Sequence, residues 1–420
     1  MEGIRKLRLT NDDKALILLC SHIGIKDTEL KPLTLKQWNE LANKIANSSI
    51  KRPQNLFSMD FEELKGELKI PENQIENIEK LLSRSLELGV ELERLYSKGI
   101  KVVTRASYLY PRKLKKILKD ASPPVIFYCG NLELANEDGI GIVGSRNIKE
   151  EYVEFTKELV KKAINENLVI YSGGAKGIDD TSEKEAFNQG GKYVSFLADS
   201  LEARIKKKDI RDKLATNRIL LMTSMKPDVG FSVGSAMNRN KYIYSLSNGT
   251  FIIASDYNKG GTWTGATENL KNKWTKTFIR KDVKLKGNEE LIKLGAMPVD
   301  DIANLSIHDI LKNDSKPEIK EEDTIEQLDL ESMLMVKEEN GTYESREIEV
   351  SDNKIDNNFD LYYHVIDVII DAVKGEKSID ELSELLNVNK AQINVWLKRA
   401  VEDNKIKRLQ KPIRYIKSNL

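Results

Sequence analysis

The sequence contains few of the residues that build metal centres and disulfide frameworks. Its 420 residues include two cysteines, Cys20 and Cys129, and three histidines, His22, His308 and His364. These residues form no cluster with the spacing of zinc or iron–sulfur ligands, so we predict no metal site and no cofactor. The two distant cysteines exclude a disulfide scaffold. Any acid–base chemistry would depend mainly on Asp and Glu.

Long apolar runs are also missing. No stretch approaches the roughly 20 apolar residues of a membrane helix, and the start MEGIRKLRLTNDD has no apolar core typical of a secretion signal. We therefore expect a cytoplasmic protein with no membrane partner. Because 40% of the residues are hydrophobic and 32% are charged, the chain can bury cores. Its length predicts two or three domains of about 150 residues.

The net charge of +1 conceals an uneven distribution along the chain. Residues 313–358 hold 15 acidic and 5 basic residues, whereas residues 1–312 hold 42 acidic and 51 basic residues. Such an acidic segment cannot bury a core of its own. We therefore predict a flexible acidic linker over residues 312–358, in which the apolar run Leu330–Val336 could dock locally or pair with a partner.

Residues 1–99 are predicted to form a helical domain. Apolar residues recur at three- and four-residue steps, as in Leu35, Trp38, Leu41 and Ile45. At least four helices are expected, and none of them carries an obvious catalytic group. We interpret this domain as a structural or dimerising module.

Residues 100–311 have the pattern of a doubly wound α/β sheet. Short apolar runs typical of buried parallel strands alternate with amphipathic helical stretches. The expected strands lie at residues 139–144, 167–173, 192–198, 218–224 and 249–255, and the expected helices near 149–165, 179–189, 235–247 and 263–273. The predicted fold class is therefore α/β, with a mostly parallel sheet.

Residues 359–420 are predicted to form a winged helix-turn-helix domain. Three helical patterns, with a tight turn at 387–389, precede a segment in which apolar and basic residues alternate. Residues 398–420 hold eight basic and two acidic residues, which favours contact with phosphate. A run of charged residues, however, usually forms only a surface that is exposed to solvent. The candidate contacts are Lys398, Arg399, Lys407, Arg408, Lys411 and Arg414.

Gly144, Ser145 and Arg146 follow the first expected strand. The glycine lets the backbone turn closely, the serine is expected to cap the next helix, and the arginine is expected to project from its first turn. Free N–H groups at a helix start, together with a guanidinium group, suit a phosphate. The alternative is an ordinary helix cap with a solvent-facing arginine, and these three residues leave both interpretations open.

The next strand ends in a second glycine-rich loop, which contains Ser172, Gly173, Gly174, Lys176 and Gly177. Like known phosphate-binding loops, this loop is rich in glycine and joins a strand to a helix, but it matches neither the dinucleotide-binding pattern nor the P-loop pattern. Because the two loops follow neighbouring parallel strands, they face the same crevice at the edge of the sheet where ligands bind. The pair is therefore a more specific signal than either loop alone.

Two later segments extend the candidate site. Arg239, Asn240 and Lys241 are expected at the start of a helix, where phosphate contact and a solvated helix end are the alternatives. Gly261 and Thr262 follow the strand at 249–255 and open a further helix.

In this order, the segments resemble the DprA/Smf family of DNA-processing proteins, over roughly residues 110–280. The matching residues are Tyr110-Pro111, Leu114, Pro123-Pro124-Val125-Ile126-Phe127, Gly130, Ile142-Val143-Gly144-Ser145-Arg146, Ser172-Gly173, Ala175, Gly177-Ile178-Asp179, Gly190-Gly191, Arg239-Asn240, Leu246-Ser247, Gly261, Thr264 and Ala266. The order of helical domain, central sheet and winged helix also agrees with longer members of this family.

The resemblance implies an extended Rossmann fold and a basic pocket that binds single-stranded DNA. It further implies a homodimer and a RecA-type recombinase as partner, in DNA recombination, DNA uptake or defence against foreign DNA. By position, it assigns Arg146, Lys176 and Arg239–Lys241 to the pocket. The sequence departs from the family pattern at Ser182-Glu183, where a histidine is usual, and at Ser255, where a glutamate is usual.

Two alternatives stand beside single-stranded DNA binding, which requires no catalysis. Residues 260–268 loosely match the P-G-G-x-G-T-x-x-E signature of LOG-type phosphoribohydrolases. In the first alternative, the chain is a nucleotide phosphoribohydrolase with Glu268 as its acid or base, or it is a nucleotide sensor. The other interpretation of Glu268 is a carboxylate in the first turn of a helix, stabilised by the helix dipole. Trp263 would either stack on a base or fill the core. In the second alternative, the linker and winged helix belong to an adaptor that docks a protein.

Overall fold

The computed structural model describes residues 9–26, 29–312, 362–373, 375–386, 390–410 and 413–417. The chain divides into two compact units, one formed by residues 1–33, 40–97 and 329–420, and the other by residues 34–39 and 98–328. The predicted linker at 312–358 lies outside the described residues apart from Lys312, as do Leu330–Val336 and the turn at 387–389. The predicted domain boundaries therefore stay predictions.

The N-terminal region is helical, as predicted. It contains α1 (Asn11–Cys20), α2 (Leu35–Asn47), the 3-10 helix η1 (Pro53–Ser58), α3 (Phe61–Leu68), α4 (Glu72–Leu82) and α5 (Ser85–Ser97). Thr10 and Asp60 cap α1 and α3, each in a reciprocal pair with an acidic residue three positions later. The buried Arg84 donates to the carbonyl oxygens of Leu18 and Ile23, so it ties the start of α5 to the end of α1.

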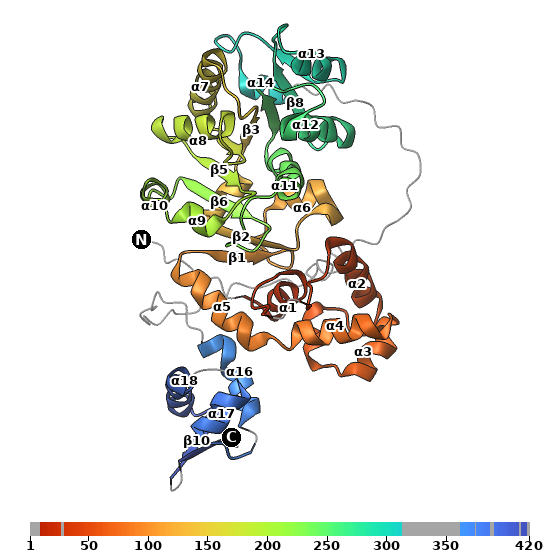
Figure 1. The fold of residues 1–420 in the computed structure, drawn as a ribbon, viewed down its shortest axis with the longest axis vertical. Helices are drawn as coiled ribbons and strands as arrows, with labels where there is room; N and C mark the ends of the chain where they lie inside the picture. The colour runs from red at the N-terminus through yellow and green to blue at the C-terminus, as the bar shows by residue number, and fades with distance from the viewer. Residues whose placement is uncertain are drawn as a thin grey trace, which may run out of the picture. The chain divides into compact units, whose positions relative to one another are not determined.

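Nine strands form one mixed sheet in the second unit (Figure 1). They are β1 (Lys101–Thr104), β2 (Val125–Gly130), β3 (Gly139–Val143), β4 (Val169–Ser172), β5 (Tyr193–Phe196), β6 (Ile219–Thr223), β7 (Gly249–Ile252), β8 (Lys276–Arg280) and β9 (Met297–Val299). Their spatial order is β1-β2-β6-β5-β4-β3-β7-β8-β9. The pairs β1–β2 and β2–β6 are antiparallel, and all the other pairs are parallel. The predicted mostly parallel α/β fold is confirmed.

Helices lie on both faces of this sheet. They are α6 (Arg112–Leu118), η2 (Lys119–Ala121), η3 (Leu132–Asn136), α7 (Glu150–Asn165), α8 (Ile178–Asn188), α9 (Leu201–Ile205), α10 (Lys208–Leu214), α11 (Val233–Leu246), α12 (Gly260–Asn272), α13 (Lys286–Lys293) and α14 (Ile307–Lys312). Figure 1 shows α7 and α8 on one side of the sheet and α6, α11 and α12 on the other. Fully buried aromatic side chains fill the space between the layers, including the stacked pair of Phe251 and Phe278, whose ring centres are 4.8 Å apart.

The C-terminal part contains α16 (Tyr362–Ala372), α17 (Ile379–Leu385), α18 (Lys390–Glu402), β10 (Ile406–Leu409) and β11 (Arg414–Lys417). The two strands form an antiparallel hairpin. Buried side chains from the three helices and the hairpin share one core, which includes Ile369, Leu382, Trp396 and Ile406. These elements follow the expected outline, and the interpretation as a winged helix rests on that outline. None of the helices in the described part of the chain is long and apolar enough to cross a membrane.

Candidate nucleic-acid interface

The candidate site lies at one edge of the parallel sheet. β3 lies between β4 and β7 and pairs in parallel with both. The chain proceeds from β3 to β4, β5 and β6 on one side, and then from β7 to β8 and β9 on the other, so the strand order reverses at β3 and β7. Ligands of doubly wound sheets bind beyond the carboxyl ends of the strands at such a reversal. We call this region the carboxyl edge.

The loops after β3 and β4 pack directly against each other at this edge. Gly177 has a φ of +91°, and a Cβ atom there would lie 2.5 Å from the carbonyl oxygen of Ser145 and 2.7 Å from Arg146 Cα. A Cβ atom on Gly144 would lie 2.7 Å from the side chain of Ile178. Both positions therefore require glycine, because any side chain would push the two loops apart.

Ser145 does not cap a helix, so that prediction is wrong. Its N–H donates to the carbonyl oxygen of Ala254 beyond β7, at 2.9 Å, and its hydroxyl accepts from the N–H of Asn147, at 3.1 Å. Because these bonds hold Ser145 in a turn, α7 begins only at Glu150, where the N-cap residue Lys149 provides no side-chain cap. Arg146 consequently projects from a loop and not from the first turn of a helix.

Arg146 and Lys176 are exposed cations, one in each of the two loops, and Lys149 is a further exposed cation just before α7. Neither Arg146 nor Lys176 has a carboxylate within 4.0 Å in the part of the chain that the structure describes. The guanidinium group of Arg146 lies over the ring of Phe231, 4.9 Å from its centre. The structure therefore presents two positive charges, without ion-pair partners, from loops that touch.

Arg239 is buried beneath these loops. Its side chain is 8% exposed, and its Nη1 atom lies 3.7 Å from Oδ2 of the equally buried Asp179. A Cβ atom on Gly173 would overlap the guanidinium group, so glycine makes room for it. Burial lowers the pKa of Arg239, which the Asp179 carboxylate opposes; burial likewise raises the pKa of Asp179, which Arg239 and backbone N–H groups oppose. Arg239 Nε is buried with no hydrogen-bond partner among the described residues.

The expected helix start at Arg239, Asn240 and Lys241 is wrong. Ser232 is the N-cap of α11, because its hydroxyl accepts from the N–H of Ser235. The helix therefore begins at Val233, and the three residues lie in its interior. They reach the carboxyl edge through their side chains and not through a helix terminus.

Asn240 and Lys241 connect α11 to the neighbouring helix. The Asn240 amide donates to the carbonyl oxygen of Gly261 at 2.9 Å, and a Cβ atom on Gly265 would lie 2.9 Å from the same amide nitrogen. Lys241 is half-buried, with Nζ 5.5 Å from the centre of the Tyr242 ring; burial lowers its pKa, which the Glu268 carboxylate of α12 opposes. These two residues join helices, whereas Arg146 and Lys176 face solvent.

The start of α12 follows β7 at the carboxyl edge. Gly260, with a φ of +79°, opens the helix, and Thr262 lies in its first turn. Trp263 is partly buried against the core and meets the Tyr257 ring edge-on, with ring centres 5.0 Å apart, which favours the packing role. Glu268 lies in the third turn because α12 begins earlier than expected, so its interpretation as a first-turn carboxylate is wrong.

Ser172 and Gly174 have structural roles in the second loop. The buried hydroxyl of Ser172 donates to the carbonyl oxygen of Ile142 in β3, at 2.8 Å. Gly174 has a φ of +66°, and a Cβ atom there would lie 2.6 Å from Leu197 and 3.4 Å from Arg204. The conformation of this loop is therefore set by its contacts with Ile142, Leu197 and Arg204 beneath it.

A buried charged cluster beneath Gly174 was missed by the sequence analysis. Glu183 accepts from the Ser195 hydroxyl at 2.6 Å and from Arg204 at 3.3 Å. Burial raises the pKa of Glu183 to about 7, against the effects of Arg204 and Ser195. Asp179 and Glu183 are four residues apart on α8 and therefore share a helix face, which was the available signal. Glu183 was noted only as a departure from the family pattern.

The basic candidates of the C-terminal part lie in the other compact unit. Lys398 in α18 and Lys407 and Arg408 in β10 are exposed, and Arg399 is partly buried. Arg414 lies 3.7 Å from the carboxylate of Glu381. Lys411 lies outside the described residues.

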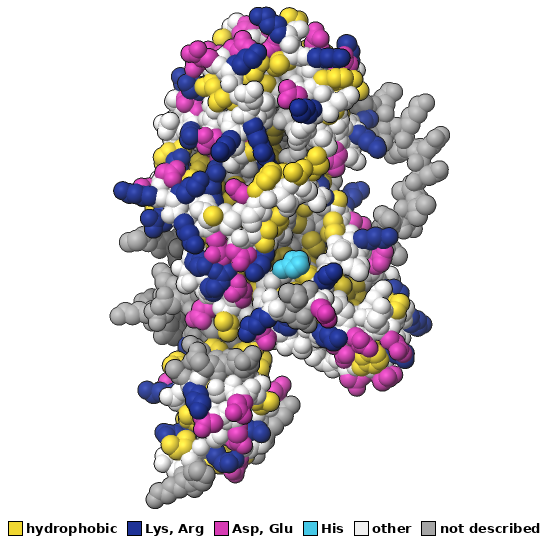
Figure 2. Space-filling view, viewed as in Figure 1, with side chains coloured by type: hydrophobic (Ala, Val, Ile, Leu, Met, Phe, Trp, Pro, Cys, Tyr) yellow, Lys and Arg dark blue, Asp and Glu magenta, His cyan; other side chains and the backbone are white. Residues whose placement is uncertain are grey.

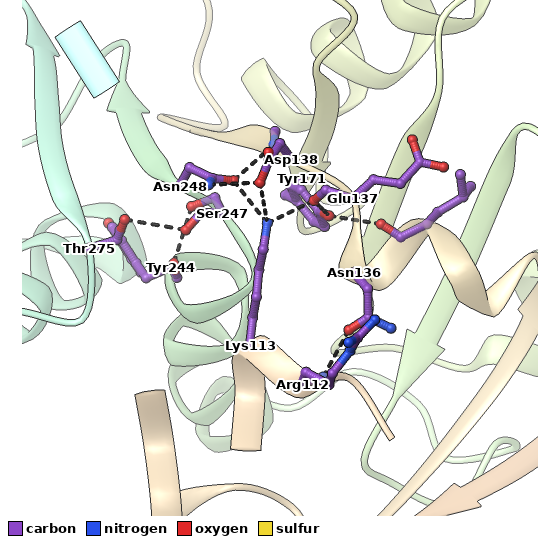
Figure 3. Close-up of polar contacts among 12 residues, drawn as sticks. Arg112, Lys113, Asn136, Glu137, Asp138, Tyr171, Tyr244, Ser247, Asn248 and Thr275 are labelled. Carbon is purple, nitrogen blue, oxygen red and sulfur yellow. Dashed lines mark hydrogen bonds and ion pairs between the residues drawn. The ribbon is translucent and has the colours of Figure 1, made fainter. Parts of the chain in front are cut away.

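Polar side chains at the amino ends of β3 and β7 form a network, which we call the amino-edge network (Figure 3). Lys113 Nζ donates to the carbonyl oxygen of Glu137 at 2.7 Å and to Oδ1 of Asn248 at 2.8 Å, and it lies 3.5 Å from Asp138. Tyr171 donates to the same Glu137 carbonyl oxygen. Burial lowers the pKa of Lys113, which Asp138 opposes. Each of these groups has a partner, so the network connects segments and leaves no free charge.

A pocket of about 250 Å³ lies beside β8 and β9. It is lined by side chains beside β8 and β9: Phe278, Met297, Pro298, Val299, Asp300, Asp301, Leu305 and Ile310. None of the predicted site residues lines it. The predicted crevice at the carboxyl edge therefore remains a prediction, whereas the contact between its two loops is a structural observation.

Comparison with known proteins identifies similar sequences and solved structures, among which is one from Streptococcus pneumoniae. The family model of DNA recombination-mediator protein A matches residues 101–310. DNA processing protein DprA of Streptococcus pneumoniae is 32% identical over 114 residues, which cover 27% of this chain and 39% of that protein. DNA processing protein DprA of Bacillus subtilis is 28% identical over 188 residues, which cover 41% and 62%. The chain thus matches less than two thirds of either relative.

The solved structure of the Streptococcus pneumoniae protein has the same fold. It superposes with a TM-score of 0.54 at 19% identity, over 70% of this chain and 96% of that chain. The fold similarity extends beyond the residues that the family model matches.

Proposed function

The chain belongs to the DNA recombination-mediator protein A family, and from this premise we propose that it binds the phosphate backbone of single-stranded DNA at the carboxyl edge. The observation that carries the proposal is the pair of exposed cations, Arg146 and Lys176, on loops that touch. Cations that neutralise phosphates release counterions from the nucleic acid, so binding of this kind weakens as salt increases.

Each part of the carboxyl edge has a role in this proposal. Arg146 and Lys176 contact phosphates, and the glycines let the two loops that carry these cations pack together. Arg239 lies below them, and a phosphate oxygen would provide the acceptor that its Nε lacks among the described residues. Gly261 and Thr262 are proposed to border the site through the start of α12, where backbone N–H groups favour an anion.

The proposal assigns the protein to DNA processing and recombination by binding and not by catalysis. Glu268 lies beyond the first turn of α12. A phosphate at the start of that helix would therefore not be adjacent to it. The homodimer and the RecA-type partner, which the family resemblance implies, remain predictions. The cytoplasmic location also remains one.

Fluorescence anisotropy with a labelled oligo-dT tests this function. We expect Arg146→Ala and Lys176→Ala each to weaken binding about five- to tenfold, as for loss of one charged hydrogen bond at an exposed site. Each substitution should also reduce the slope of log affinity against log salt by about 0.7.

Lys192→Ala is the matched control. Lys192 is exposed and pairs with Glu137 at 2.7 Å, near the amino end of β5, so its loss removes the same charge at a distance from the carboxyl edge. The control should bind almost as well as the unmodified protein. Equal affinities for all four proteins would overturn the proposed function.

A further inference from the structure

The segment between β6 and α11, together with the first turns of α11, exposes four large apolar side chains. Val229, Phe231, Val233 and Met237 are 44%, 50%, 64% and 42% exposed. Apolar side chains that lie together at the surface often mark a site where another molecule binds. Hydrophobic side chains are also exposed among Lys and Arg side chains in Figure 2, in the region where Figure 1 places α11.

Phe231 is distinguished from the other three by what lies beside it. The guanidinium group of Arg146 is 4.9 Å from the centre of its ring. A guanidinium group over an aromatic ring is held by a cation–π interaction, yet it keeps its N–H donors for another acceptor. The pair therefore combines a flat apolar surface with a cation at the carboxyl edge.

We propose that Phe231 is a stacking site for an unpaired nucleobase whose adjacent phosphate contacts Arg146. The inference rests on the proposed function and specifies its ligand as a strand with unstacked bases. Stacking on an aromatic side chain accepts any base, because every base has a π face. Bases in a duplex are stacked and paired, so a duplex offers phosphates to Arg146 but no free base to Phe231.

Charge favours a nucleic acid over a protein segment as the occupant of this surface. The ring is flanked by a cation that forms no ion pair with any residue that the structure describes, and the second cation, Lys176, lies on the abutting loop. A single strand alternates an anion with a flat apolar group at each nucleotide, which matches one cation beside one ring.

The test compares two strands of equal length and equal charge, oligo-dT and an oligomer of abasic deoxyribose phosphates. We expect Phe231→Ala to weaken oligo-dT binding about tenfold and to leave binding of the abasic strand unchanged. Phe231→Trp should keep the affinity for oligo-dT, because indole also stacks. Leu294→Ala is the control, since Leu294 is 56% exposed near the start of β9, and it should change neither affinity.

Several outcomes would overturn the inference. If Phe231→Ala weakens both strands equally, Phe231 only positions Arg146; if it weakens neither, the surface serves another purpose. Arg146→Ala separates this failure from failure of the proposed function, because it should weaken both strands. Loss of that effect would refute the phosphate site itself, and with it the stacking site. Comparison of Tm values confirms that each variant is folded.

Discussion

The two edges of the central sheet differ in whether their polar groups have hydrogen-bond or ion-pair partners. At the amino edge, Lys113, Asp138, Asn248 and Tyr171 bind one another or nearby carbonyl oxygens (Figure 3). At the carboxyl edge, exposed Arg146 forms no ion pair within the described residues, and the buried Nε of Arg239 has no hydrogen-bond partner there. Both edges belong to the same strands and the same compact unit.

This difference distinguishes a structural network from a binding surface. An exposed cation without a partner costs little, since water solvates it. A buried donor without a partner costs about 1–3 kcal/mol, so a ligand oxygen that accepts from Arg239 Nε would recover part of that cost. Arg204 Nε, Tyr244 Oη and Ser245 Oγ are also buried without a hydrogen-bond partner among the described residues, so Arg239 Nε supports the exposed cations as evidence for a ligand and does not replace them.

Asp179→Ala is expected to have the largest effect, because it removes the carboxylate nearest to buried Arg239. Breaking a buried ion pair from one side typically costs about 3 kcal/mol, so the free energy of unfolding should fall by about that amount. Urea denaturation measures this. Asp180→Ala is the control, since Asp180 forms an exposed pair with Lys184 and should lose less than about 1 kcal/mol. If the two variants were equally stable, the buried Asp179–Arg239 pair would not stabilise the carboxyl edge.

Glu183, which lies at the same edge, is expected to make the free energy of unfolding depend on pH. Its pKa is about 7 in the folded protein against 4.5 when unperturbed, so between these values the folded state binds more protons than the unfolded state. Stability contributed by the protonated carboxyl is therefore present below about pH 4.5 and is lost as the pH rises through about 7. Relative to Glu183→Gln, the unmodified protein should lose on the order of 2 kcal/mol between pH 5 and 8.

The measurement is the free energy of unfolding of both proteins at several pH values. Gln at position 183 can still accept the Ser195 hydrogen bond, so the comparison isolates the ionisable proton. A difference between the two proteins that does not change with pH would show that Glu183 is charged in both states.

The sequence predicted the strands of the site well because their signals are local. Gly144 and Gly177 mark turns that follow buried apolar runs, and parallel pairing brings such turns to one edge. Strands β1, β2, β8 and β9 were not among the expected strands; they lie at the outermost positions of the sheet, two at each side. Their pairing depends on distant partners that no local pattern reveals.

Side-chain roles were harder to predict than strands. Arg239 and Arg146 look alike in the sequence, yet one is buried against Asp179 and the other is exposed beside Phe231. The difference arises because α11 begins at Val233, which places Arg239 in the helix interior. Phe231 had no motif to indicate it, because its contact with Arg146 joins residues that are far apart in the sequence.

Lys113→Met is expected to have the smallest effect and tests the comparison most directly. Methionine keeps the packing of the lysine stem beside Tyr171 but removes the ammonium group. Each acceptor keeps another donor: Asn248 retains the Gly139 N–H, Asp138 retains the Asn248 amide, and the Glu137 carbonyl retains Tyr171. The free energy of unfolding should therefore fall by only about 1 kcal/mol.

Lys113→Met should also leave the affinity for oligo-dT unchanged, whereas Arg146→Ala should weaken binding at unchanged stability. Urea denaturation and anisotropy on the same two proteins measure both quantities. Lys192→Met is the control for charge, because its pair with Glu137 is exposed and should contribute less than about 1 kcal/mol. If Lys113→Met weakened DNA binding as much as Arg146→Ala, a fully partnered cation at the amino edge would contribute to DNA binding as much as an unpaired one at the carboxyl edge. The inference that one edge stabilises the fold and the other binds DNA would then be wrong.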